Sequence, residues 1–321
     1  MTTATSSFNL TRFLRCYKDT LWRNKNNGII YFILSFIALP LQYIMTLSTM
    51  LTRQDVDFSN YLQGVANCYT DSSMVMFTAL TLGVSVLIPM QMLSYMHNKR
   101  SVDVYHSLPF SRSELLGANI SAGLTFIIVP ILINFSIVAV ISAGQPFGMP
   151  METIIEALYW CVSVLATFSL VVLISTMVGT LFDTFIFSAL MDFSWLIFYG
   201  IFIFLSEGFL AGFDSQSFLL FDDFYYLSPS LFWLGRLSFN PRYGNLNHLI
   251  FCNLAWIVIS ILFLALAFLV YQRRDSEKAE SSTDKGPLSI YARIVGTFGG
   301  GLLLGLLFSA TLNMYNEEIP L

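Results

Sequence analysis

The sequence predicts an all-α fold, a polytopic transmembrane helix bundle of about seven spans. Apolar residues make up 55% of the 321 positions, charged residues only 11%, and the mean hydropathy is +0.68, well outside the range of soluble domains. The apolar runs reach the roughly 18 residues or more that a membrane helix needs. Such runs favour helices, which satisfy their own backbone hydrogen bonds in lipid, over the alternating strands of a closed barrel.

We expect seven spans because seven stretches are long enough to cross roughly 30 Å of hydrocarbon at about 1.5 Å per residue. They run from Gly28 to Met50, Ser72 to Met96, Ser113 to Ser142, Ile155 to Gly179, Asp183 to Leu205, Leu249 to Gln272 and Ile290 to Asn313. In the seventh, glycines at 296, 299, 300, 301 and 305 include two GxxxG spacings, which favour close helix packing.

The distribution of lysine and arginine predicts a cytoplasmic N-terminus. Basic residues gather before the first span, between the second and third, and between the sixth and seventh; only Arg53, Arg236 and Arg242 fall on the other side. Because positively charged flanks resist translocation, the segments rich in lysine and arginine are expected to be cytoplasmic. This topology puts Leu321 outside.

The segment before the first span has the pattern of an amphipathic helix. From Phe8 to Trp22, its apolar side chains recur at spacings of three and four residues, with Arg12, Arg15 and Lys18 elsewhere. The pattern predicts a helix lying in the membrane interface. The alternative is that the segment merely extends the first span.

The loop from Asn98 to Glu114, NKRSVDVYHSLPFSRSE, predicts a short helix lying crosswise beneath the membrane. We expect Ser101 to cap this helix and Pro109 to end it, and Ser111 with Glu114 to form a capping box that opens the third span. Its side chains would suit docking into a groove on a soluble partner, and the exposed ones are expected to be Val102, Val104, Tyr105, His106 and Leu108. The alternative is a solvated connector.

This loop carries a resemblance to a known family. NKRSVDVYHSLPFSR resembles the loop after the second span in bacterial ABC transporter permeases of the exporter-like class, where it serves as a coupling helix. The stretch YQRRDSEKA, Tyr271 to Ala279, is similar to the segment after the sixth span in that family, which commonly carries an Arg-x-Ser-Glu pattern. The resemblance implies coupling to an ATPase through six residues: Arg100, Val102, Asp103, Tyr105, His106 and Leu108.

The resemblance also implies an organisation and a set of partners. Residues 1–279 would form a six-helix permease core with its interfacial helix, and residues 280–321 a seventh span with a short tail, in a shortened member or part of a longer protein. The partners would be membrane lipid, a second permease subunit and a cytoplasmic ATPase holding ATP and magnesium, with no nucleic acid. The location would be a bacterial inner membrane, and the direction of transport would be export.

The sequence holds no chemistry of its own that would make the chain an enzyme. No GxxxxGK[ST] motif occurs, so ATP hydrolysis is expected in a separate subunit. The histidines and cysteines lack metal-ligand spacing, and we expect this chain to bind no metal or cofactor.

One carboxylate is expected near the middle of the bilayer. Asp192 lies nine residues beyond Asp183, which opens the fifth span. It suits a proton-coupling site, a substrate contact, or a protonated carboxyl bonded to polar neighbours such as Gln91 or Asn134. An ion-coupled secondary transporter that uses Asp192 is therefore the alternative function, and a membrane-embedded enzyme or scaffold is a third class with no catalytic constellation to support it.

Overall fold

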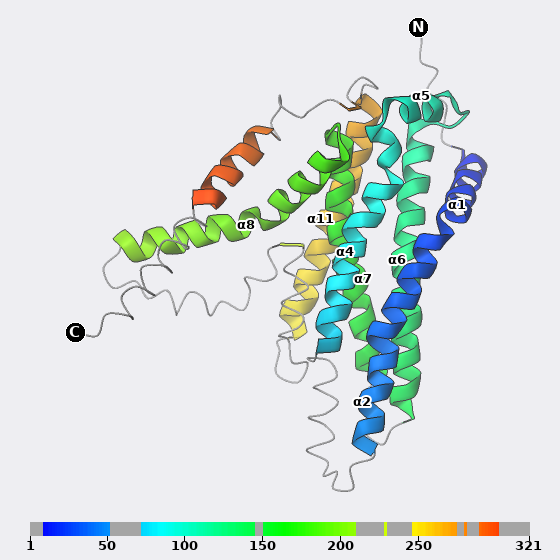
Figure 1. Ribbon diagram of the computed structural model, residues 1–321, viewed down its shortest axis with the longest axis vertical. Helices are drawn as coiled ribbons and strands as arrows, with labels where there is room; N and C mark the ends of the chain where they lie inside the picture. Colours follow the sequence, from blue (N-terminus) through cyan, green and yellow to red (C-terminus); the bar gives the residue numbers. More distant parts are fainter. Residues whose placement is uncertain are drawn as a thin grey trace.

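The structure, a computed structural model, is a bundle of long helices (Figure 1). It describes residues 9–51, 72–144, 150–209, 228–229, 246–274, 279–280 and 289–301, and every regular element in these ranges is helical. Six of the helical stretches are long and apolar enough to cross a membrane. The predicted all-α, multi-pass membrane fold is confirmed.

The helices follow the predicted spans closely. In chain order they are α1 (Leu10–Phe36), η1 (Ile37–Leu41), α2 (Gln42–Leu51), α4 (Ser72–Met92), η2 (Ser94–His97), α5 (Lys99–Ser107), α6 (Arg112–Ala143), α7 (Pro150–Met177), α8 (Leu181–Phe209) and α11 (Leu246–Arg273). The elements η1 and η2 are a π-helical and a 3₁₀ turn, and η1 contains Pro40, which cannot donate a backbone hydrogen bond.

The predicted interfacial helix is continuous with the first span. A single helical run covers Leu10–Ser48, 39 residues, which is about 58 Å at 1.5 Å per residue and exceeds the roughly 30 Å of hydrocarbon. Its first turns therefore project beyond the membrane core. Phe13, Tyr17 and Leu21 pack against the bundle, whereas Leu10, Leu14 and Trp22 are exposed. The backbone of this segment is therefore an extension of the first span, as the alternative interpretation expected.

Helix α7 is the centre of the bundle. Within its apolar stretch 78% of the residues are buried, against 19% in α8 and 22% in α11. It packs against α4, α6, α8 and α11, and Figure 1 shows it among them, with α8 leaning away. The α4 ring of Phe77 joins three helices, because it makes edge contacts with Phe135 of α6 and Trp160 of α7 at centroid distances of 5.7 and 5.2 Å.

Glycines allow close approaches at some helix crossings. A Cβ on Gly28 would lie 2.6 Å from Cδ1 of Phe126, so α1 meets the α6 aromatic ring only because this position has no side chain. The predicted packing role of the last glycines holds at Gly299, where a Cβ would lie 2.9 Å from Ile197 of α8. At Gly296 and Gly300 no atom of the described residues lies within 4 Å of an added Cβ.

The seventh predicted span is described only in part. Residues 289–301 are helical, and the remainder of Ile290 to Asn313 lies outside the described residues, as does Gly305.

Three segments rich in basic residues meet at one end of the bundle. The first turns of α1, the region of η2 and α5, and the end of α11 lie together there, uppermost in Figure 1. We call this end of the molecule the basic end. The charge pattern predicts that it is cytoplasmic.

Candidate functional site

The short helix α5 lies across the basic end, between α4 and α6 (Figure 1). Asn98 begins it: the Asn98 Oδ1 accepts hydrogen bonds from the backbone N–H groups of Arg100 and Ser101 at 3.0 and 3.4 Å. The prediction that Ser101 caps this helix is therefore wrong, because the asparagine three residues earlier already satisfies the first free donors. The helix ends at Ser107, before Pro109, as predicted.

The capping box that opens α6 is present and reaches further than predicted. The Ser111 Oγ accepts from the Glu114 N–H at 3.2 Å, and Glu114 Oε2 accepts from the Ser111 N–H at 2.8 Å. Glu114 Oε1 also accepts from the backbone N–H of Asn9 at 2.6 Å. One buried carboxylate thus fixes the beginnings of both α6 and α1.

Helix α5 has an inner and an outer face. Val102 is only 4% exposed, so the expectation that it belongs to an exposed docking surface is wrong, whereas Tyr105 is half-buried. Val104 is 62% and Leu108 39% exposed. Arg100 and Asp103 are also exposed, and His106 lies in the last turn with its side chain outside the described part of the structure. The outer face is formed by Arg100, Asp103, Val104 and Leu108.

Tyr105 attaches the inner face of α5 to three other elements. Its ring lies 4.5 Å, centroid to centroid, from the ring of Tyr95 in η2. Its hydroxyl accepts a hydrogen bond from Arg23 Nη2 of α1 at 3.0 Å. The Tyr95 hydroxyl donates in turn to the Tyr271 hydroxyl of α11 at 3.2 Å. These contacts link α5 to α1 and α11.

Arg274 holds the ends of three elements together. Its side chain is 6% exposed, and Nη1 donates to the carbonyls of Ser175 and Thr176 at 2.8 and 3.2 Å, while Nη2 donates to the carbonyl of Met96 at 3.0 Å. Ser175 and Thr176 belong to the last turn of α7, where carbonyls lack partners within the helix and the dipole favours a cation. Burial lowers the pKa of Arg274.

Sequence reasoning missed this role of Arg274, although a signal was present. Arg274 is the first residue of the Arg-x-Ser-Glu pattern that resembles the permease family. Arg112 adds a second link, since its Nη1 donates to the carbonyls of Gln272 and Arg274 at 3.2 and 2.7 Å. It thereby caps the end of α11 from the start of α6.

His97 lies beside Arg274 and is neutral at physiological pH. It is 6% exposed, and its Nε2 lies 3.0 Å from the Ser175 hydroxyl. Burial, and then the positive charge of Arg274, lower the pKa of His97 to about 4, against smaller opposing effects of the Gly179 backbone and Asp183. A neutral imidazole is what a site beside a buried guanidinium tolerates.

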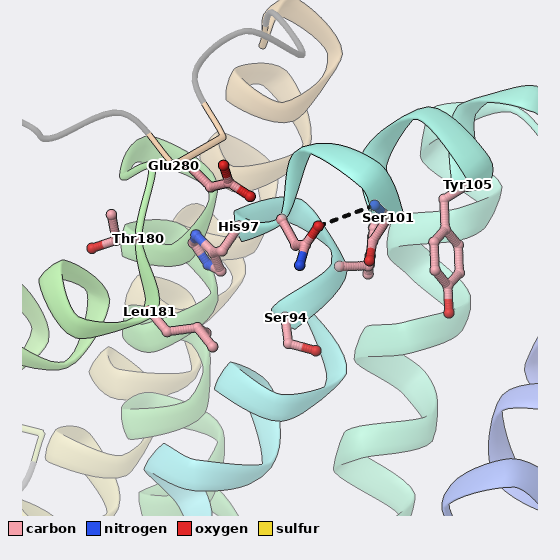
Figure 2. A pocket seen from close by; sticks show the side chains of 9 residues that line it. Ser94, His97, Ser101, Tyr105, Thr180, Leu181 and Glu280 are labelled. Carbon is pink, nitrogen blue, oxygen red and sulfur yellow. Dashed lines mark hydrogen bonds between the residues drawn. The ribbon is translucent and has the colours of Figure 1, made fainter.

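A cleft of about 590 Å³ opens beside α5 (Figure 2). Figure 2 shows the side chains of His97, Ser94 and Glu280 around it, with Tyr105 at its far side. Glu280 closes the cleft at the start of α5, because its Oε1 accepts from the Lys99 N–H at 3.2 Å and its own N–H donates to the Gly179 carbonyl at 3.0 Å. The chain after α11 is thus bonded to both α5 and the α7–α8 turn.

The predicted intramembrane polar residues do not form one site. Asp192 is 6% exposed, and Ser228 Oγ lies 2.9 Å from both its Oδ1 and its backbone carbonyl. Asn134 Nδ2 donates to Ser35 Oγ at 2.7 Å, and Gln91 Oε1 accepts from Asn27 Nδ2 at 2.9 Å. The suggestion that Gln91 or Asn134 bonds Asp192 is wrong, because each has a different partner.

No protein-family model matches the chain, and no curated protein matches it. In the described ranges no three histidine, cysteine, aspartate or glutamate side chains group as metal ligands would.

Proposed function

We propose that this chain is the membrane-spanning permease subunit of an ATP-binding cassette transporter in a bacterial inner membrane. A separate cytoplasmic subunit hydrolyses ATP and holds the magnesium, a second permease subunit completes the pore, and the substrate is exported. The observation that carries the proposal is the position of α5. It presents an outer face to solvent at the basic end, while its inner face is bonded to the bundle.

The contacts of α5 support a route for mechanical coupling. An ATPase docked on Arg100, Asp103, Val104 and Leu108 would push a helix that is fixed to η2 through Tyr105 and Tyr95. The Arg23 and Tyr271 hydrogen bonds carry that displacement to α1 and α11. Motion of a short helix then shifts the population between two arrangements of the spans.

The test is affinity purification of the detergent-solubilised chain from its native host. We expect a stoichiometric P-loop ATPase to accompany it and to be lost when Val104 and Leu108 are replaced by glutamate. Tyr105 is a poor probe, because its loss would detach α5 from the bundle. The matched control is Met151→Glu, which changes an apolar side chain that is 69% exposed at the other end.

A second candidate function rests on the buried Asp192. An ion-coupled secondary transporter would use this carboxylate, which accepts a hydrogen bond from Ser228 inside the protein. This candidate predicts a chain that purifies reproducibly without an ATPase. It also predicts that transport fails in Asp192→Asn and when the ion gradient is dissipated, whereas the permease proposal predicts transport that depends on ATP.

A further inference from the structure

A second cavity, of about 370 Å³, shares Ser94, Tyr95 and Tyr105 with the cleft in Figure 2. It is bounded by α1, by the end of α4 with η2, and by the start of α6. Its volume is near the lower limit of ligand pockets, about 300–1,000 Å³, which suits a small polar group and excludes a whole phospholipid.

The lining of this cavity favours an anion. Arg15 and Arg23 both line it, together with Asn24, Gln91 and Asn119. One N–H of the Asn24 amide and one of the Asn119 amide donate to backbone carbonyls of their own helices, which leaves one N–H of each for a ligand. The one lining carboxylate, Asp19, is 3.9 Å from Arg23 Nη1, so it offsets only part of the positive charge. Within the described ranges the Arg15 guanidinium has no hydrogen bond or ion pair. Guanidinium groups with amide donors nearby are the usual partners of phosphate.

One end of the cavity lies near the depth of lipid headgroups. Trp22, one residue before Arg23, is 71% exposed, and Lys25 Nζ lies 3.9 Å over its ring, an arrangement typical of the membrane interface. The predicted hydrocarbon boundary at Gly28 is five residues from Arg23, about 7.5 Å along α1. The headgroup layer of each leaflet is about 5–8 Å thick, so headgroups of the inner leaflet reach Arg23. Arg15 is thirteen residues from Gly28, about 20 Å along α1, and therefore lies beyond this layer.

We propose that this cavity binds a phosphate group held by Arg15 and Arg23, supplied by an anionic phospholipid headgroup or by a soluble phosphate ester. Headgroups reach the Arg23 end of the cavity and soluble esters reach the Arg15 end, and the titration below separates the two sources. Arg23 also donates to the Tyr105 hydroxyl, so the bound phosphate shares a guanidinium with α5. Leu108 of the outer face also lines the cavity, so the two proposals share one residue and are tested with different variants.

The test is native mass spectrometry of the detergent-purified chain, titrated with phosphatidylglycerol, with phosphatidylcholine and with inorganic phosphate. We expect one phosphatidylglycerol per chain, and weaker binding of phosphatidylcholine. Each neutralised arginine should weaken phosphatidylglycerol binding about fivefold, and the double variant Arg15→Gln with Arg23→Gln about 30-fold. Lys18→Gln is the matched control, because Lys18 is exposed on the same helix and does not line the cavity.

Three results would overturn the proposal. They are equal binding of the two lipids, unchanged affinity in the double variant, and an equal loss in Lys18→Gln, which would indicate a diffuse effect of charge. Displacement of phosphatidylglycerol by equimolar inorganic phosphate would overturn the lipid as the source of the phosphate. The elution volume of each variant in size-exclusion chromatography checks that the chain is folded. If the double variant does not fold, the two single variants still test the proposal.

Discussion

In the described part of the chain, no carboxylate forms an ion pair with Arg274. Its charge is stabilised instead by three backbone carbonyls, two of them at the end of α7, where the helix dipole is negative. Guanidinium suits this position because its planar fork directs several donors at once and is weakly hydrated. A buried charge of this kind is stable only while every partner stays in place.

Replacing Arg274 by methionine should destabilise the basic end by about 2–4 kcal/mol, because the carbonyls of Met96, Ser175 and Thr176 lose their donors. Arg274→Lys should fall between methionine and the wild type, since one ammonium group cannot reproduce the fork. The measurement is the thermal unfolding midpoint in detergent. Arg273→Met is the control, because Arg273 is the exposed neighbour of the same type. Equal midpoints for the two methionine variants would show that the hydrogen bonds of Arg274 do not stabilise the basic end.

His97 should make the fold sensitive to acid. Its pKa in the folded chain, about 4, is below its ordinary value of 6.5, so the unfolded chain takes up a proton first as the pH falls. The stabilisation is complete above pH 6.5 and is lost as the pH falls toward 4. At about pH 5 the loss is about 2 kcal/mol, at roughly 1.4 kcal/mol per unit.

The check is the unfolding midpoint of the wild type and of His97→Gln between about pH 7.5 and about pH 5. Glutamine places an amide near the position of Nε2 and cannot be protonated. We expect the midpoint to fall less with acidification in this variant than in the wild type. A parallel decline in both proteins would assign the acid sensitivity to other groups.

At the scale of the element, sequence patterns predicted the helix ends and caps that depend on residues adjacent in the chain. Pro109 as the end of α5 and the box of Ser111 and Glu114 follow from local geometry, and both are present. The bond from Asn9 to Glu114 joins residues 105 positions apart, so no local pattern could indicate it. The burial of Val102 was missed for a similar reason, since the side of α5 that faces the bundle depends on where Tyr95 lies.

Glu114→Gln should loosen the beginnings of two helices. Glutamine has one carbonyl oxygen where the carboxylate has two, so one of the N–H groups of Asn9 and Ser111 loses its acceptor, at about 1–2 kcal/mol. Hydrogen exchange should accelerate at residues 9–13 of α1 as well as at the start of α6. The control is Asp103→Asn, which also removes one negative charge but at an exposed position. It should leave both segments protected. Faster exchange at α6 alone would show that the Asn9 contact does not hold α1.

For the whole molecule, hydropathy predicted six of the spans because crossing a bilayer requires only length and apolar composition, both readable from the chain. Which helix is central is a property of packing. Helices α7 and α11 have similar mean hydropathy, 2.3 and 2.7. Nevertheless 78% of the apolar stretch of α7 is buried, against 22% of the apolar stretch of α11. The polar partners of Asp192, Asn134 and Gln91 likewise come from distant segments, which is why their expected grouping failed.

The orientation of the bundle decides whether any cytoplasmic ATPase could reach α5. The segments rich in lysine and arginine converge at one end, so we expect that end to be cytoplasmic. Single cysteines at Ser107 of α5 and Met151 of α7, in a background without native cysteines, mark the two ends, and both positions are exposed. A membrane-impermeant maleimide should label Met151→Cys in intact cells and Ser107→Cys only in inside-out vesicles. The reverse pattern would put α5 outside the cell, where no ATP-hydrolysing subunit could dock, and would leave Asp192 as the better basis for transport.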